Sequence, residues 1–253
     1  MSVDPVAAAG FGSVADVYER ARPSYPEAAV QWIADLTGLG PGRVVADVGA
    51  GTGKLTRLLL STGARVIAVE PIQAMREVLR ESVAGVEVMD GVAESLPLAD
   101  ASVDVVTVAQ AFHWFDHAKA IPELHRVLRP GGALVLIWNS RDMSDPLQRA
   151  LEELLAPLRQ DAPYQLGGAW RKPLDASELF AAPDEARFAI EQQMTRQGVR
   201  DRITSTSFVA AMPTEERAAL LQRVDGLTEG RDEPFAFPYV TEVYVAERSN
   251  AST

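Results

Sequence analysis

Five short apolar runs alternate with helical patterns over the first 140 residues, and this alternation constrains the fold more than any other feature. Apolar residues three and four positions apart between the runs indicate amphipathic helices. Connections as short as these favour helices that cross from one parallel strand to the next, on both faces of one sheet. The runs that we expect to form buried strands are 44–48, 65–70, 86–89, 103–109 and 133–138.

The pattern changes after residue 141. Two strands joined through helices indicate an antiparallel strand that closes the parallel sheet. No linker and no second hydrophobic core is evident, so we expect one domain over residues 1–253. The elements expected here are a helix at 146–159, turns at 161–183, a strand at 187–194, helices at 199–211 and 213–227, and an edge strand at 235–246.

Composition excludes several kinds of site. The 24 basic and 35 acidic residues give a net charge of −11, which disfavours nonspecific binding to a nucleic-acid backbone. The chain has no cysteine, so disulfides, thiolate metal sites and thiol nucleophiles are excluded. There is no apolar run of membrane-spanning length and no basic leader. We therefore expect a cytoplasmic protein, a monomer or homodimer, without a membrane or nucleic-acid partner.

A glycine-rich turn follows the first predicted strand, in the segment Asp47-Val-Gly49-Ala-Gly51-Thr-Gly53-Lys54. Glycines allow the backbone to approach a ligand and to adopt positive φ, and the following helix start presents free N–H groups. Glu70 ends the second strand, where a carboxylate can accept hydrogen bonds from both hydroxyls of a ribose. The alternative is a turn that only packs the helix against the strand.

Two related nucleotide-binding motifs do not fit this turn. The dinucleotide motif GxGxxG requires glycine at position 54, which is Lys54. The phosphate-binding motif GxxxxGK[ST] requires glycine at position 48 and serine or threonine at position 55, where the chain has Val48 and Leu55. The spacing favours a ligand that contains adenosine but no pyrophosphate.

Four successive segments resemble the motifs of class I S-adenosylmethionine-dependent methyltransferases. They are VADVGAGTGKLTRLLL, VIAVEPIQAM, GVAESLPLADASVDVVTVAQAFHWFD and LRPGGALVLIWN. The resemblance covers residues 12–140 and is strongest to the type 11 small-molecule group that includes trans-aconitate methyltransferases. It implies a Rossmann-like α/β fold whose seven-stranded sheet has an antiparallel last strand. It also implies a helical lid at 1–40, a cofactor-binding core at 41–140, and the remaining sheet with a substrate cap at 141–253.

The resemblance implies roles for individual residues around S-adenosyl-L-methionine, which leaves the reaction as S-adenosyl-L-homocysteine. Gly49, Ala50 and Gly51 would pass the methionine part, with Asp47 near its amino group and Glu70 on the ribose. The residues implied on the adenine are Pro71, Ile72, Met75 and the backbone of Ala93, and those beside the methionine end are Gln110 and Ala111. Many relatives have Asp at the position of Val92, so Glu94 or Asp90 would replace that contact here.

His113 follows the fourth strand and is a candidate general base, since imidazole titrates near neutral pH. The alternative is a structural histidine in a turn. His113, Asp116 and His117 are too few and too close in the chain to indicate a metal site, and we expect no metal. Tyr18 and Arg22 in the lid would hold the methionine carboxylate or the acceptor.

The acceptor pocket is predicted from aromatic residues and one arginine. These are Tyr25, Trp114, Phe115, Arg200 and Phe208. Arg200 and Arg202 share a predicted helix, and guanidinium groups there would suit a carboxylate acceptor. The aromatic residues favour an apolar acceptor instead, with Arg22 at the mouth, and this is the acceptor that we expect.

These observations predict methyl transfer to an O, N or C atom of a small molecule by in-line displacement. Two alternatives remain at this point: an S-adenosylmethionine-binding enzyme that catalyses a cyclisation or rearrangement, and a non-catalytic regulatory relative. The product mass separates the first alternative from methyl transfer. Cofactor affinity without turnover would indicate the second.

Overall fold

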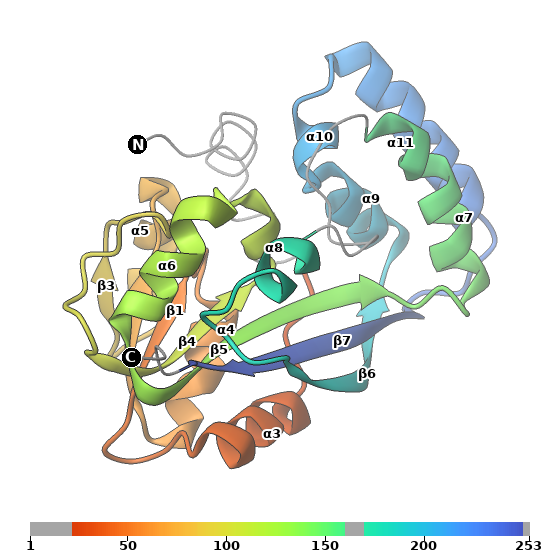
Figure 1. The fold of residues 1–253 in the computed structure, drawn as a ribbon. Coiled ribbons are helices and arrows are strands. Elements are labelled where there is room, and N and C mark those ends of the chain that lie inside the picture. Colours follow the sequence, from red (N-terminus) through yellow and green to blue (C-terminus); the bar gives the residue numbers. More distant parts are fainter. Residues whose placement is uncertain (1–21, 160–169, 250–253) are drawn as a thin grey trace.

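The computed structural model describes residues 22–159 and 170–249 of the chain. Figure 1 shows one long twisted sheet with helices on both faces and a group of helices beyond one end. The predicted lid residue Tyr18 lies outside the described residues. None of the helices in the described ranges combines the length and the hydropathy that a membrane span needs.

The sheet has seven strands in the order β3-β2-β1-β4-β5-β7-β6. The pairs from β3 to β5 are parallel, whereas β7 runs antiparallel to both of its neighbours. The prediction of an α/β fold with seven strands and an antiparallel last strand is confirmed. The bounds are β1 (Val44–Val48), β2 (Arg65–Val69), β3 (Glu87–Met89), β4 (Val103–Ala109), β5 (Leu128–Arg141), β6 (Asp184–Met194) and β7 (Phe235–Glu247).

The prediction that residues 235–246 form an edge strand is wrong. β7 lies between β5 and β6, with Leu136 opposite Tyr244 on one side and Ile190 opposite Tyr239 on the other. The edge is β6. Alternating burial along β7 shows that its two faces have different surroundings, but it says nothing about which strands lie beside it. This is why the sequence pattern did not give the strand order.

β5 is longer than its apolar run. Leu128 pairs with Val103, the register then shifts, and regular pairing resumes at Ala133 opposite Val105. The Arg-Pro-Gly-Gly sequence is therefore an irregular start of the strand, with Gly131 at φ 73°, rather than a separation before it. At its other end β5 continues to Arg141, which carries polar residues beyond the apolar run to the carboxyl edge of the sheet.

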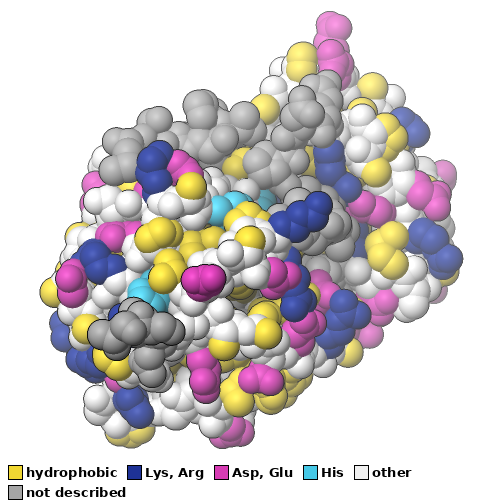
Figure 2. All heavy atoms as spheres, viewed as in Figure 1, with side chains coloured by type: hydrophobic (Ala, Val, Ile, Leu, Met, Phe, Trp, Pro, Cys, Tyr) yellow, Lys and Arg dark blue, Asp and Glu magenta, His cyan; other side chains and the backbone are white. Residues whose placement is uncertain are grey.

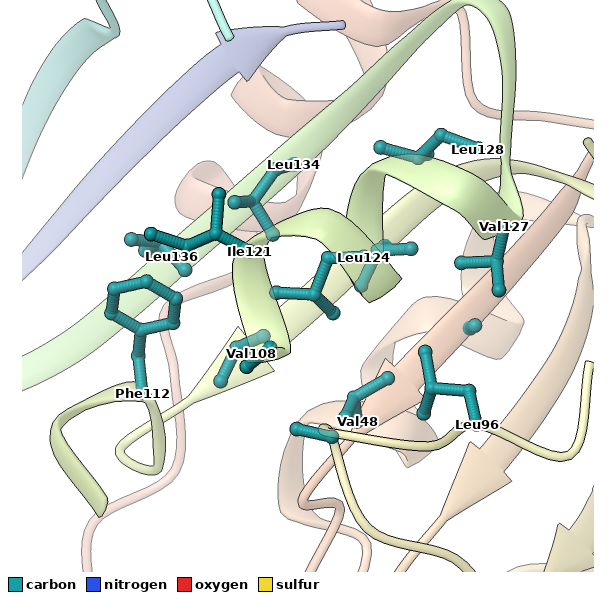
Figure 3. Close-up of a cluster of buried hydrophobic side chains, with 14 of the residues drawn as sticks. Val48, Leu96, Val108, Phe112, Ile121, Leu124, Val127, Leu128, Leu134 and Leu136 are labelled. Atoms are coloured by element: carbon teal, nitrogen blue, oxygen red, sulfur yellow. The ribbon is translucent and has the colours of Figure 1, made fainter. Parts of the chain in front are cut away.

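The two faces of the sheet are covered by different helices. On one face lie α3 (Glu27–Thr37), α4 (Lys54–Leu59) and α5 (Gln73–Ser82), and on the other α6 (His117–Val127) and α8 (Arg171–Asp175). Figure 3 shows α6 directing Ile121 and Leu124 toward the strands. Each fully buried leucine contributes roughly 1.5–3 kcal/mol. α6 includes Pro122 in its interior.

Four helices gather beyond one end of the sheet (Figure 1), and we call this group the cap. They are α7 (Pro146–Leu155), α9 (Arg196–Thr204), α10 (Ser207–Ala210) and α11 (Thr214–Thr228). The cap has its own cluster of buried hydrophobic side chains, which includes Leu151, Val199 and Phe237. No pattern in the sequence indicated this second hydrophobic core. β5 and β7 nevertheless run continuously from the sheet toward it, and the single-domain interpretation stays a prediction.

The outer surface carries charges of both signs. On the face shown in Figure 2, acidic and basic side chains are interspersed, and hydrophobic side chains gather near the middle of the view. The described part of this face therefore shows no large patch of a single charge sign.

Candidate active site

The glycine turn after β1 uses each of its three glycines differently. All three have positive φ: 69° at Gly49, 57° at Gly51 and 86° at Gly53. A Cβ on Gly49 would lie 2.8 Å from the Cβ of Ala111, and one on Gly53 would lie 3.0 Å from Leu79. A Cβ on Gly51 would meet nothing within 4 Å. Gly49 and Gly53 therefore permit close packing, whereas Gly51 faces open space.

Glu70 ties the end of β2 to this turn. Its Oε2 accepts a hydrogen bond from the Gly51 N–H at 2.9 Å, and its Oε1 accepts one from the Ile72 N–H at 2.9 Å. Burial raises the pKa of the carboxyl, and these backbone donors and the Arg76 charge oppose the rise. Each carboxylate oxygen has a further lone pair. Glu70 can therefore accept additional hydrogen bonds where the two loops meet.

Asp47 lies beneath the turn and is fully buried. Its two oxygens accept hydrogen bonds from the Thr56 hydroxyl at 2.6 Å and the Thr107 hydroxyl at 2.8 Å. Burial raises the pKa of Asp47 to about 6, although both hydroxyls lower it. The carboxylate thus connects β1 to α4 and β4, and it lies outside the lining of the pocket described next.

A pocket opens at the carboxyl ends of β1, β4 and β5, and with its open mouth it encloses about 480 Å³. β2 lies on one side of β1 and β4 on the other, so the strand order reverses at this point. Ligands bind at such switch points in open α/β sheets. The lining residues are Arg22, Pro23, Tyr25, Gly49, Ala50, Gly51, Thr52, Lys54, Leu55, Ala109, Gln110, Asn139 and Arg202.

Two polar residues define the pocket wall at β4 and β5. Gln110 has φ 58°, a strained value for a residue other than glycine, and its N–H donates to the Ile137 carbonyl at 2.9 Å. The Asn139 amide donates to the Ser24 carbonyl at 3.0 Å, and its Oδ1 accepts from Thr241. Asn139 therefore fixes the segment before α3 against the pocket. α3 itself packs on the sheet.

His113 lies in a short 3₁₀ helix, η2 (Phe112–Trp114), after β4. Its Nδ1 is buried without a hydrogen-bond partner. Burial above all, together with the positive charge of Arg22 and the nearby His117, lowers the pKa of His113 to about 3. The imidazole is therefore neutral at physiological pH. His113 does not belong to the pocket lining, and neither do Trp114 and Phe115.

The residues predicted on the adenine lie outside the pocket lining. Met75 and Ala93 are 3% exposed. Pro71 and Ile72 follow Glu70 and are half-buried. Glu94 accepts a hydrogen bond from the Asp116 N–H at 2.8 Å through one carboxylate oxygen.

In the cap, the arginines predicted together in one helix point to different places. Arg200 pairs with Asp225 of α11 and does not line the pocket. Arg202 lines it and is 8% exposed. Phe208 packs against the hydrophobic cluster of the cap. The predicted helix at 199–211 is divided into α9 and α10, and the two arginines lie two residues apart on α9.

Asn139 was not predicted from the sequence to line the pocket, and Arg202 was considered only together with Arg200. Arg202 stands between Val199 and Ile203 at helical spacing, and both of these are fully buried. An arginine on the apolar face of a helix is the signal that would have indicated it. Asn139 directly follows the apolar run of β5, where a polar side chain meets the carboxyl edge of the sheet. Among the described residues, no group of three or more His, Asp or Glu side chains is placed to hold a metal ion.

Comparison with known proteins gives the family. A family model described as a methyltransferase domain matches residues 46–136. The uncharacterized methyltransferase Rv3342 of Mycobacterium tuberculosis is 39% identical over 236 residues, which cover 91% of this chain and 92% of that protein. The chain belongs to the class I S-adenosylmethionine-dependent methyltransferases. A methyltransferase-like protein of Schizosaccharomyces pombe, C25B8.10, is 35% identical over 85% of this methyltransferase and 84% of its own length.

Solved structures agree with this assignment. A protein of Anaeromyxobacter dehalogenans assigned to the type II methyltransferases has a TM-score of 0.66 and 26% identity, over 90% of this chain and 96% of that chain. An N-methyltransferase of Haemonchus contortus, in complex with phosphomonomethylethanolamine and S-adenosylhomocysteine, has a TM-score of 0.57 and 17% identity. The alignment covers 99% of this chain and 61% of that one, and shows a shared fold. The predicted family and enzyme class are confirmed.

Proposed function

We propose that this methyltransferase binds S-adenosyl-L-methionine along the glycine turn and transfers its methyl group to a small-molecule acceptor in the pocket. The observation that carries the proposal is the hydrogen bond between the Gly51 N–H and Glu70. It brings a carboxylate, a ligand-facing glycine and the switch point of the sheet to one place. An adenosine ligand needs this combination for its ribose and for the chain that leaves the ribose.

The residues present fit the cofactor. Glu70 would accept the ribose hydroxyls with the lone pairs that the backbone donors leave open. The open space beside Gly51 is a place that a Cβ would fill, and a cofactor backbone can occupy it instead. Gly49, Ala50 and Gln110 would flank the methionine part. Asp47 would support the turn from below, since its oxygens already accept from two threonines.

The adenine contacts form the other end of the proposed cofactor site. Pro71, Ile72 and Met75 would flank the ring, and the Ala93 N–H would donate to a ring nitrogen. One oxygen of Glu94 accepts from the Asp116 N–H, so its second oxygen is available for the exocyclic amine. This site is separate from the pocket, as expected for a long ligand that passes over the glycine turn.

When bound, S-adenosyl-L-methionine supplies a methyl group that its sulfonium already activates. The work left to the protein is to align the acceptor with that methyl group and to exclude water. Alignment alone can lower a barrier by roughly 7–11 kcal/mol. Tyr25 and the backbone around Ser24 form a wall that Asn139 fixes in place. We assign the alignment to this wall and to the cap.

His113 fits a structural role better than that of a general base. An efficient base has a pKa near the operating pH, whereas burial lowers the pKa of His113 to about 3. Its Nδ1 is also buried, and His113 does not line the pocket. If His113 is nevertheless the base, His113→Gln will lower turnover roughly 100-fold or more. Turnover near that of the wild type would support the structural role.

The test of the proposal is calorimetry with S-adenosylhomocysteine. Glu70→Ala removes the carboxylate and will weaken binding by roughly 1.5–3 kcal/mol, the range for hydrogen bonds to a charged group. Glu77→Ala is the matched control, because Glu77 is an exposed residue of α5 that pairs with Gln73. Unchanged affinity in Glu70→Ala would contradict the assignment. With an acceptor, mass spectrometry will show the gain of one methylene unit.

A further inference from the structure

Within residues 22–159 and 170–249, Arg202 is a buried cation without an acidic partner. It is 8% exposed and lines the pocket. Its Nε has no hydrogen-bond partner, and its Nη1 lies 3.4 Å from the Thr206 hydroxyl, a long contact for a hydrogen bond. No carboxylate of the described residues forms an ion pair with it. A buried guanidinium without an anion is costly to maintain, so this position calls for an anion that the described chain does not supply.

The fold holds Arg202 in this place. Val199 and Ile203 lie on the same face of α9. Both are fully buried and pack in the hydrophobic cluster of the cap. Arg202 lies between these two residues on the same buried face of the helix. Arg200, two residues earlier, points to α11 and reaches an acid there. The two arginines therefore differ because they lie on different faces of α9, and only Arg202 shares the buried face with Val199 and Ile203.

The surroundings of Arg202 are positive. Arg22 lines the same pocket, and its Nη2 donates to the Ser205 carbonyl at 3.2 Å, next to the end of α9. None of the described residues that line the pocket is Asp or Glu. Asp47 and Glu70 are buried and lie outside the pocket lining, and each of their carboxylate oxygens accepts one hydrogen bond from the protein. Two guanidinium groups therefore line the pocket.

We propose that Arg202 is the anion-binding residue of the pocket and that its guanidinium takes the carboxylate of a bound small molecule. Arginine suits this role because its planar N–H groups match both oxygens of a carboxylate. This inference rests on the proposed function for the identity of the ligands. Two molecules of that reaction can bring a carboxylate: the cofactor, through its methionine end, and the acceptor. A carboxylate acceptor would replace the apolar acceptor expected from the aromatic residues.

The experiment compares Arg202→Met with Arg200→Met by calorimetry. Met keeps most of the length of the side chain and removes the charge, and Arg200 is the matched control on the same helix. The probes are S-adenosylhomocysteine, 5′-methylthioadenosine (which lacks the amino acid part), citrate and inorganic phosphate. Arg202→Met will lose at least roughly tenfold in affinity for a carboxylate probe. Its affinity for 5′-methylthioadenosine will stay unchanged and so show that the variant is folded.

The outcomes identify the source of the carboxylate. A loss for S-adenosylhomocysteine assigns the site to the cofactor, and a loss confined to citrate assigns it to the acceptor. A loss confined to phosphate would overturn the carboxylate assignment. Equal affinities of both variants for all carboxylate probes would overturn the proposal. If the wild type binds citrate through Arg202 but neither adenosine compound, the anion site stands and the proposed methyl transfer fails.

Discussion

The cofactor-binding half of the sheet and the cap build their parts of the site in different ways. In the sheet, residues 47–70 place backbone groups and buried carboxylates, and these are held by strand pairing and by short hydrogen bonds within one segment. In the cap, α9 places a single long side chain, and packing among helices holds it. The first arrangement is local in sequence. The second depends on how distant helices pack.

Because of this difference, we expect the sheet half and the cap to recognise different ligands. The geometry of the glycine turn and Glu70 suits the part of the ligand common to all reactions of the family. Arg202 and the wall formed by Tyr25 and Asn139 face the place where the acceptor would bind. Changes in the sheet should therefore affect folding and cofactor binding together, whereas changes in the cap should affect one ligand at a time.

The largest effect is expected at the glycine turn. Gly49→Ala places a methyl group 2.8 Å from the Cβ of Ala111 at φ 69°, and the strain and overlap will lower the free energy of unfolding by roughly 2–5 kcal/mol. The methyl group of Gly51→Ala has open space, so this variant will lower the free energy of unfolding by only about 1 kcal/mol. Its methyl group will instead lie in the path proposed for the ligand. Denaturant unfolding measures the first effect and S-adenosylhomocysteine affinity the second. Equal stability losses in the two variants would contradict this account.

Asp47 makes the sheet half sensitive to pH. Its pKa is about 6 in the folded protein and 3.8 in the unfolded chain, so the native state binds the proton more tightly. Its contribution to stability is therefore complete below about pH 4 and is lost as the pH rises through 6, by about 3 kcal/mol. Asp47→Asn will remove this part of the pH dependence, whereas Asp35→Asn at an exposed site of α3 will not. The check is the unfolding free energy from urea titrations at a series of pH values. If it changes with pH in the same way in the wild type and in Asp47→Asn, Asp47 contributes nothing to the pH dependence.

The smallest effect is expected at Arg200. Its ion pair with Asp225 lies between partly exposed side chains, and such pairs contribute about 0.2–1 kcal/mol. Arg200→Met will lower the unfolding free energy within that range and leave ligand affinities unchanged. Thermal unfolding at low and high salt provides the check, because salt screens an exposed pair. A loss of ligand affinity in this variant would remove the distinction between Arg200 and Arg202.

The sheet half was predictable because its signals are local. Apolar runs indicated the strands, and the glycine turn indicated the end of the sheet where the pocket opens. The five runs formed five strands, although in the sheet these lie in the order β3-β2-β1-β4-β5 and not in chain order. The position of β7 was not predictable in this way. Its alternation of buried and half-buried residues is the same whether a strand lies at an edge or between two others.

The cap was harder because its site residue depends on helical phase. Arg200 and Arg202 look equivalent as charges in one predicted helix. Only the burial of Val199 and Ile203 shows which arginine faces inward. Asn139 was missed because β5 extends beyond its apolar run to Arg141 through pairing with β7, and that pairing is a contact between residues about 100 positions apart.

The central claim is that the cofactor lies across the glycine turn with its ribose on Glu70. A crystal structure of the protein with S-adenosylhomocysteine tests it most directly. The expected result is a pair of ribose hydroxyls within about 3 Å of the Glu70 carboxylate, with the amino acid part against Gly51 and Gln110. S-adenosylhomocysteine bound elsewhere, or a ribose that does not contact Glu70, would contradict the account.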